Sequence, residues 1–229
     1  MNRVRSAAWL ALWAVILAGS VEAGQGAVPA GSSAASAELA SIPFSFDGPP
    51  VPLPPEVISR DTSGHATIRA VRLTAPLRLD GRLDEPVYAS VPSISDFIQQ
   101  EPIEGSPATE KTEVWLFFDR DNVYVAARCW ETHPERRVAR EMRRDNPAII
   151  QGDHVSFMFD TFYDRRNGVF FNIGPTGGRM EGQFINERQV NLDWNPVIDI
   201  KVGRFEGGWT IEAAFPFKSL RYRAGRAQI

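Results

Sequence analysis

The sequence has very little cysteine and histidine, and this scarcity excludes several kinds of protein. With a single cysteine, Cys129, in 229 residues, the chain cannot form an internal disulfide, so its fold must depend on core packing. Cys129 shares strand parity with apolar neighbours, which predicts a small buried side chain rather than a catalytic thiol. The three histidines are too scattered to suggest a zinc site from their spacing.

The sequence also lacks an excess of charge and lacks familiar enzyme motifs. Its formal net charge of −3 and its pI near 5.7 argue against nucleic-acid binding, because such proteins normally carry a basic excess or a basic face. No nucleophile elbow, zinc-protease helix, phosphate-binding glycine loop or paired-cysteine motif is present. The composition, 43% hydrophobic and 23% charged, is nevertheless typical of a folded protein.

An apolar run at residues 7–18 follows Arg3 and Arg5 close to the N-terminus. The run is shorter than the ~20 residues that a helix needs to cross a membrane, so it predicts a secretory signal. Small side chains at Val21 and Ala23 predict cleavage after Ala23. We therefore expect residues 1–23 to be a signal peptide, and the mature chain to lie in the periplasm or at the surface of a Gram-negative-type bacterium, or to be secreted.

Residues 24–66 have the composition of a tether. Residues 24–40 are almost all glycine, alanine and serine, and residues 43–55 contain six prolines. Such chain buries too little apolar surface to offset its ordering entropy, and its proline-rich part favours a stiff, extended spacer. A docking peptide for a proline-binding partner is the alternative. This division leaves residues 67–229 as one folded domain.

Apolar residues in that domain recur with a period of two, which predicts short strands at residues 113–118, 123–130, 154–160, 169–173, 179–186, 197–202 and 209–215. Close turns separate them, including the polar segment at residues 119–122. The pattern predicts an all-β fold, an antiparallel β-sandwich of the jelly-roll or immunoglobulin-like kind. One or two short helices are expected, the first capped by Asp84 and running through Ala89, the second at residues 134–142.

Tryptophan positions separate core from surface. Trp115 and Trp209 lie inside alternating strands and are expected in the core. Trp130 has the parity opposite to Cys129, and Trp194 lies in a polar loop, so both are expected near the surface. Because indole faces stack on sugar rings while polar neighbours bind hydroxyls, these two are candidate ligand-binding residues; packing is the equal alternative for Trp194.

Carboxylates allow two further kinds of chemistry. Two acids across a cleft, with Glu181 and Glu212 as candidates, could hydrolyse a glycosidic bond if they stood at the right separation. Oxygen ligands could instead bind calcium, for which the candidates are Glu131, Asp153 and Asp160. The acids at residues 119–122 are better explained as turn residues that accept local amide protons.

The order of several motifs resembles the family 9 carbohydrate-binding module-like domain. It resembles especially the version found at the N-terminus of bacterial surface proteins that continue into a predicted outer-membrane β-barrel. The matching segments are LDGRLDEP at residues 79–86, QQEP at 99–102, GSPATE at 105–110, RRD at 143–145, GD at 152–153, DTFYDRRN at 160–167, DW at 193–194, GW at 208–209 and FPFKSLR at 215–221.

The resemblance implies a non-catalytic module that binds sugar in support of carbohydrate breakdown, with structural calcium nearby. Trp194 would stack on a sugar ring, Asp193 and Asn195 would bind hydroxyls, and Arg144 and Asp145 would line the loop side of the site. A monomeric module is expected, with an outer-membrane barrel as a partner in the same chain or in another. Because barrel-linked relatives continue beyond this point, one interpretation of the chain is as part of a longer protein.

The chain departs from the family pattern at several positions. Family sugar binders carry tryptophan just before the Gly-Asp pair and glutamate two residues into the next strand. This chain has residues 149–151 and Ser156 there, and also Tyr88 and Ile198 where tryptophan is usual. Two alternatives therefore stay open: a periplasmic domain that caps a barrel and has lost its sugar site, and a glycoside hydrolase.

Overall fold

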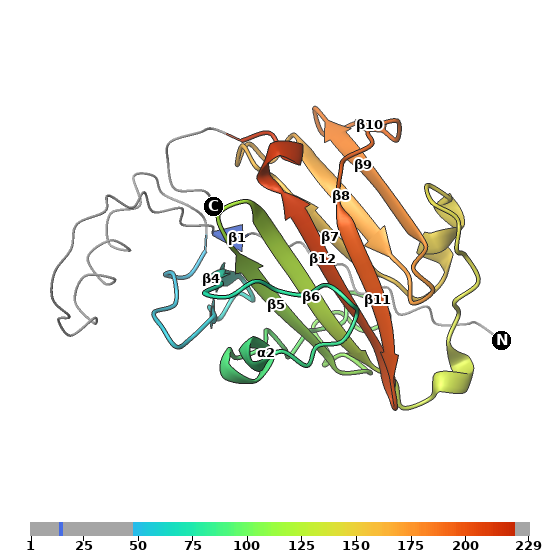
Figure 1. The fold of residues 1–229 in the computed structure, drawn as a ribbon, viewed down its shortest axis with the longest axis horizontal. Helices are drawn as coiled ribbons and strands as arrows, with labels where there is room; N and C mark the ends of the chain where they lie inside the picture. Colours follow the sequence, from blue (N-terminus) through green and yellow to red (C-terminus); the bar gives the residue numbers. More distant parts are fainter. Residues whose placement is uncertain (1–13, 16–47, 223–229) are drawn as a thin grey trace, which may run out of the picture.

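The computed structural model describes residues 14–15 and 48–222, which form a β-sandwich (Figure 1). One sheet has four antiparallel strands in the order β10-β9-β8-β7. These strands are β7 (Val155–Phe159), β8 (Gly168–Ile173), β9 (Arg179–Ile185) and β10 (Gln189–Asn191). The all-β sandwich predicted from the period-two pattern is confirmed.

The second sheet has five strands in the order β11-β12-β6-β5-β4. They are β4 (Val71–Arg72), β5 (Thr112–Phe118), β6 (Asn122–Trp130), β11 (Asp199–Phe205) and β12 (Gly208–Pro216). All neighbours are antiparallel except β4 and β5, which run parallel. The predicted strand segments all correspond to strands of these two sheets, with ends that differ by a few residues.

Aromatic rings from both sheets interlock in the core between them. Phe157 and Phe171 come from the four-stranded sheet, and Phe215 comes from β12. The ring centroids of Phe171 and Phe215 are 4.6 Å apart, and those of Phe157 and Phe215 are 5.5 Å apart. Cys129 and Trp209, paired across β6 and β12, face the same core and are buried, as their parity predicts.

The outer face of the five-stranded sheet is covered by a second apolar layer. Tyr88, Trp115 and Phe117 pack there, together with leucines of residues 73–83. α2 (Pro86–Ser90) completes this cover. The predicted first helix is therefore present, but its N-cap is Glu85, whereas Asp84 pairs with Arg82 at 2.7 Å. Trp115 is buried as predicted, in this outer layer rather than between the sheets.

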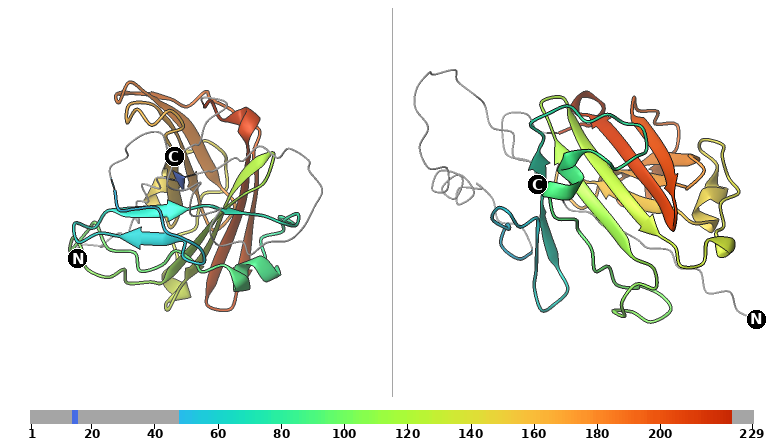
Figure 2. Two further views of the ribbon diagram at one scale, coloured as in Figure 1. Left: turned by 90° about the vertical axis from the view of Figure 1, so that its left-hand side faces the viewer. Right: turned by 60° about the horizontal axis from the view of Figure 1, so that its bottom comes forward.

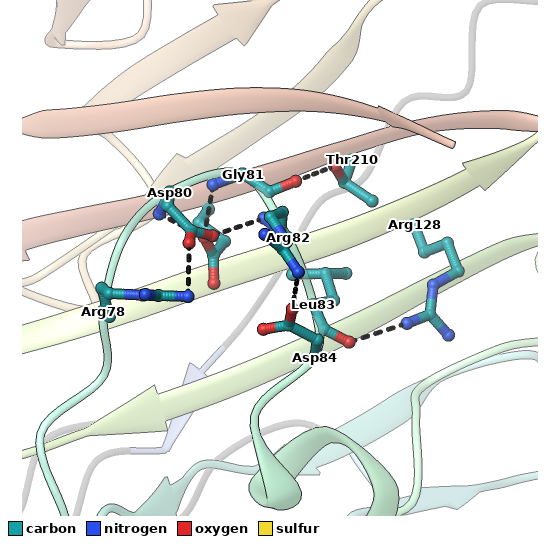
Figure 3. A network of polar contacts seen from close by, with 9 residues as sticks. Arg78, Asp80, Gly81, Arg82, Leu83, Asp84, Arg128 and Thr210 are labelled. Carbon is teal, nitrogen blue, oxygen red and sulfur yellow. Dashed lines mark hydrogen bonds and ion pairs between the residues drawn. The ribbon is translucent and has the colours of Figure 1, made fainter. Parts of the chain in front are cut away.

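A polar anchor holds this cover on the sheet (Figure 3). The backbone N–H groups of Asp80 and Gly81 donate to Oε2 of Glu212 at 2.9 and 2.7 Å, and the Tyr88 hydroxyl donates to Oε1 at 2.8 Å. Thr210 on the same strand donates to the Gly81 carbonyl at 2.5 Å. A Cβ on Gly203 would lie 1.8 Å from that carbonyl, so the close approach of the segment requires glycine in β11.

The folded domain begins earlier than the sequence predicts. β2 (Ile58–Arg60) pairs with β3 (Ala66–Arg69) as a hairpin, which the left view of Figure 2 shows as a separate pair of strands. Val57 is buried in the main core, and the Thr67 hydroxyl donates to the Pro49 carbonyl. The prediction of a tether that extends to residue 66 is thus wrong from residue 48 onward, because apolar residues between the prolines pack against the folded domain.

The remaining N-terminal predictions lie outside the described residues, apart from β1 (Ala14–Val15), which pairs parallel with β3. The predicted helix at residues 134–142 is wrong. Only a single 3₁₀ turn, η1 (Pro134–Arg136), forms there, because Arg137 turns back to pair with Glu131. Two further 3₁₀ turns are η2 (Pro147–Gln151) and η3 (Phe217–Ser219). Within residues 48–222, no helix has the length and hydropathy needed to span a membrane.

Candidate functional site

Five of the six predicted ligand-binding residues gather at one edge of the four-stranded sheet, beside β9. Arg144 and Asp145 come from the segment between the two sheets, and residues 193–195 come from the connection between β10 and β11. The Arg144 guanidinium donates to Oδ1 of Asn195 at 2.5 Å and lies 3.3 Å from a carboxylate oxygen of Asp145. Residues 51 positions apart in the sequence thus meet in one cluster.

Backbone contacts position both segments. The Asp145 N–H donates to the Arg179 carbonyl at 2.8 Å, which attaches residues 144–145 to the start of β9. On the other side, Oδ1 of Asn191 accepts the Asp193 N–H at 3.0 Å, so an Asx turn shapes the loop that carries Trp194. Hydrogen bonds to Arg179 and Asn191 therefore fix the paths of the two segments, and the two segments meet beside β9.

Glu181 lies at the centre of this cluster. It pairs with Phe171 across β8 and β9, so its side chain faces the interior between the sheets, where it is 0% exposed. Arg144 donates to its Oε1, and Nε of Arg179 lies 3.4 Å from its Oε2. No donor among the described residues makes a hydrogen bond to Oε2. Oε2 therefore has an ion-pair contact with Arg179 but no hydrogen bond within the described residues.

Burial decides the protonation behaviour of Glu181. Removal from water raises its pKa above the usual glutamate range, and the two arginines oppose that rise without cancelling it. A carboxylate held between two guanidinium groups can accept a hydroxyl proton, and the guanidinium N–H groups can donate to hydroxyl oxygens. The cluster has the donors and acceptors that a polyhydroxylated ligand requires.

Trp194 is half-buried at this edge. Its ring packs edge-on against Phe171, with centroids 5.8 Å apart and an interplanar angle of 61°, so part of the indole extends the core. Trp194 as a whole is of intermediate exposure, and the neighbouring Asn195 is exposed. Stacking of a sugar on Trp194 stays a prediction, now with a partly exposed ring at a defined position.

Trp130 does not join the other five residues. It is 36% exposed at the end of β6, on the outer face of the five-stranded sheet, and its indole N–H donates to Glu113 at 2.9 Å. Phe205, at the end of β11, packs against it with centroids 4.9 Å apart. Trp194 instead precedes the start of β11, so the length of that strand, at about 3.3 Å per residue, separates the two indoles. Parity correctly predicts exposure of Trp130, but a shared ligand site with Trp194 is wrong.

The three carboxylates predicted as calcium ligands do not form one site. Asp153 precedes β7 and Asp160 follows it, so the strand separates them. Arg137 donates to both oxygens of Glu131, and backbone N–H groups after Asp160 occupy both oxygens of that residue. Among the described residues, no group of three or more metal-ligating side chains gathers. These residues do not fit a shared calcium, and calcium binding elsewhere in the chain stays a prediction.

Glu181 and Glu212 cannot flank one glycosidic bond. Glu181 faces the interior between the sheets, whereas Glu212 shares the outer face of the five-stranded sheet with Ala214, so that sheet lies between the two carboxyl groups. A pair of catalytic carboxyls must face a common cleft at about 5–9.5 Å. The geometry contradicts the glycosidase hypothesis for these two residues.

Sequence analysis did not assign Glu181 and Arg179 to the binding site. A signal was present, because Arg179, Glu181 and Gln183 alternate with Met180 and Gly182 along one predicted strand. The buried side of that strand could not be chosen from parity alone, since either face carries residues that can be buried. Pairing of Glu181 with Phe171 decides the face.

The chain thus has the architecture of a two-sheet β-sandwich with a polar cluster at one edge. No family model and no curated protein matches it. Two solved structures of a family 9 carbohydrate-binding module from Caldicellulosiruptor kristjanssonii, with cellotriose and with glucose, resemble it at a TM-score of 0.46 and 15% identity. The matches cover 64% of this chain, and 66% and 67% of the chains in the cellotriose and glucose structures. This chain therefore spans just under two thirds of the length of the chain in the cellotriose structure.

A candidate carbohydrate-binding protein from Bacteroides uniformis ATCC 8492 resembles the chain at a TM-score of 0.49 and 9% identity. That match covers 69% of this chain and 76% of the other. The two structures from Caldicellulosiruptor kristjanssonii carry the name of the family that the sequence motifs resemble.

Proposed function

We propose that this chain is an exported, non-catalytic module that binds a poly- or oligosaccharide at the edge formed by Arg144, Glu181 and residues 193–195, in support of carbohydrate breakdown. The observation that carries the proposal is the exposed Arg144 guanidinium, which the buried Glu181 and the exposed Asn195 hold in place beside the loop of Trp194. A guanidinium held in a fixed orientation can donate its remaining N–H groups to ligand hydroxyls.

Each residue of the cluster has a role that its contacts support. Glu181 holds the Arg144 guanidinium in place, and Arg144 donates to hydroxyl oxygens with the N–H groups that Glu181 and Asn195 do not use. Asp145 and Asp193 are exposed carboxylates at the rim, where they can accept further hydroxyl protons. Trp194 offers the exposed part of its ring to the apolar face of a sugar.

Packing of Trp194 on Phe171 favours one alternative function. In this alternative the indole serves the core alone, and the domain is a periplasmic cap for an outer-membrane barrel. Such a domain would retain a membrane partner whether or not sugar is present, which separates it from the module that we propose.

Isothermal titration of the chain with glucose, cellobiose and xylo-oligosaccharides at millimolar concentrations tests the proposal. We expect measurable heat with at least one of them, and affinity at least about tenfold lower in Glu181→Gln and Trp194→Ala, since one buried hydrogen bond or one stacked ring contributes roughly 1–2 kcal/mol. Trp130→Ala is the matched control, because its indole is exposed at the other end of β11; its affinity should stay within about twofold.

Circular dichroism melting of each variant shows whether it folds. Absence of heat with every sugar would overturn the proposal. Affinity unchanged in folded Glu181→Gln would remove the assigned site, and pull-down of a membrane protein without glycan dependence would support the cap instead.

A further inference from the structure

Glu85 carries a buried carboxylate that the proposed sugar site does not use. It lies in residues 79–90, which cover the outer face of the five-stranded sheet and which we call the cover segment. Glu85 is the N-cap residue of α2, yet its carboxylate does not cap the helix. Both of its oxygens are buried, and no donor among the described residues makes a hydrogen bond to either. A buried carboxylate without donors is costly, so the charges around it determine how it behaves.

Glu85 shares its buried surroundings with Glu212, the acid that anchors the cover segment to β12. The Glu212 carboxylate accepts hydrogen bonds from the Asp80 and Gly81 N–H groups and from the Tyr88 hydroxyl, all of which belong to the cover segment. The negative charge of Glu85 adds to the rise in the pKa of both Glu212 and Tyr88, so its carboxylate lies near theirs. Two buried acids therefore lie together where the cover segment is attached to the sheet.

The basic side chains around the two acids pair with other carboxylates. Arg128, on β6, lies 3.6 Å from Glu113. Lys201 stands opposite Glu212 on β11, but its amine lies 3.5 Å from Asp199. Further pairs at this face are Lys111–Glu113 at 3.0 Å, Arg78–Asp80 and Arg82–Asp84 at 2.7 Å each, and Tyr124–Asp119 at 2.6 Å; Figure 3 shows the two arginine–aspartate pairs. Among the described residues, neither Glu85 nor Glu212 makes an ion pair, so their charges have no cation partner.

Ionisation of both acids therefore destabilises the closed position of the cover segment. Two like charges repel each other where water is removed, and each loses hydration that no cation replaces. If the cover segment leaves the sheet, both carboxylates regain water. Because burial raises the pKa of Glu212 in the folded chain, closure is most favourable at acid pH and becomes less favourable as pH rises through that pKa.

We infer that the cover segment is a pH-dependent conformational switch. It is closed on the five-stranded sheet while Glu85 and Glu212 together retain a proton, and it opens locally when both carboxyl groups are ionised. Opening breaks the three hydrogen bonds to Glu212 and exposes Tyr88 and Trp115, which pack together at this face with ring centroids 5.4 Å apart. The sugar cluster lies beside β9 in the other sheet, so local opening does not require it to change.

Hydrogen–deuterium exchange of the whole chain, read by mass spectrometry of its peptides, tests this inference. Wild-type protection of residues 79–90, corrected for the intrinsic exchange rate at each pH, should fall at least about tenfold between about pH 5 and about pH 8.5, because one pKa unit changes an opening equilibrium tenfold. Protection of β8 over the same range should fall at least about threefold less, since opening is local.

Two substitutions at neighbouring positions separate the buried charge from charge in general. Glu85→Gln removes one of the two buried charges and should reduce the fall in protection at least about threefold. Asp84→Asn is the matched control, because it removes one negative charge from the adjacent residue, which is exposed; its fall should match that of the wild type. Melting by circular dichroism shows whether each variant folds, and Glu85→Ala replaces Glu85→Gln if the latter does not.

Three results would overturn the inference. The first is wild-type protection of residues 79–90 that stays within about twofold across the pH range. The second is a fall in β8 equal to that in the cover segment, which would mean that the whole domain opens. The third is a fall in folded Glu85→Gln equal to that in Asp84→Asn. The wild-type profile needs no substitution, so the first two results decide even if no Glu85 variant folds.

Discussion

At the scale of single residues, Glu212 shows how a buried charge can serve the fold rather than chemistry. Its side chain is 0% exposed, and its carboxylate accepts three hydrogen bonds from the segment that covers the sheet. Burial raises its pKa, and the nearby Glu85 carboxylate adds to the rise, while the three donors oppose it. Tyr88 stays protonated, since burial and Glu212 raise its pKa. The LDGRLDEP motif is therefore explained by the anchor that it forms with Glu212.

We expect Glu212→Gln to lower the free energy of unfolding by about 1–3 kcal/mol, because an amide cannot accept from all three donors. The loss should depend on pH. A folded pKa above that of the unfolded chain makes the contribution of Glu212 full at acid pH and reduces it as pH rises through the folded pKa. The variant does not titrate there, so the difference from wild type should be larger near about pH 4.5 than near about pH 8.

Urea denaturation at the two pH values measures this difference. Glu206→Gln, an exposed acid in the turn between β11 and β12, is the control and should change the free energy of unfolding by less than about 0.5 kcal/mol at either pH. A loss of unfolding free energy in Glu212→Gln that grows as pH rises would contradict the raised pKa assigned to Glu212 in the folded state.

At the scale of elements, the β2–β3 hairpin shows that composition alone placed the start of the domain too late. Proline density predicted a spacer, yet Pro49 and Pro52 are buried and Val57 is 4% exposed within the main core. Proline removes a backbone donor but leaves its carbonyl, and the Pro49 carbonyl accepts from Thr67. A proline-rich segment can therefore pack against the folded domain where a neighbouring strand supplies hydrogen-bond donors for its carbonyl groups.

Val57→Ala should lower the free energy of unfolding by about 1–2 kcal/mol, because it removes two buried methyl groups and leaves a small cavity. Leu53→Ala is the matched control, since Leu53 is 51% exposed in the same segment and should cost less than about 0.5 kcal/mol. Thermal or urea denaturation decides; equal effects of the two substitutions would show that the segment behaves as a tether.

The prediction of a helix at residues 134–142 was also wrong because tertiary contacts override the local sequence pattern. Arginines spaced for a solvated helical face predicted it, but two tertiary pairings compete for the segment. Arg137 binds Glu131, and the Val138 N–H donates to the Asp153 carboxylate at 2.7 Å. A short segment gains more from these fixed partners than from one further helical turn, whose nucleation is unfavourable.

At the scale of the whole molecule, the position of the five-stranded sheet between Glu181 and Glu212 determines what the two acids can do. We expect no reducing-sugar product from oligosaccharides incubated with the wild-type chain. Any product should persist unchanged in Glu181→Gln and Glu212→Gln, which would trace it to a contaminant. Product that disappears in either folded variant would contradict this expectation and support the glycoside-hydrolase alternative.

The sequence by itself determined the strand segments, the polar turn at residues 119–122 and the burial of Cys129, Trp115 and Trp209. These features are local, because alternation along a strand separates its two faces and turn residues favour particular backbone angles. Tertiary structure decided which face meets which partner. Register between β8 and β9 turned Glu181 inward, attachment of Asp145 to β9 brought Arg144 to it, and the length of β11 separated Trp130 from Trp194. Such distances depend on sheet order, which parity along one strand does not contain.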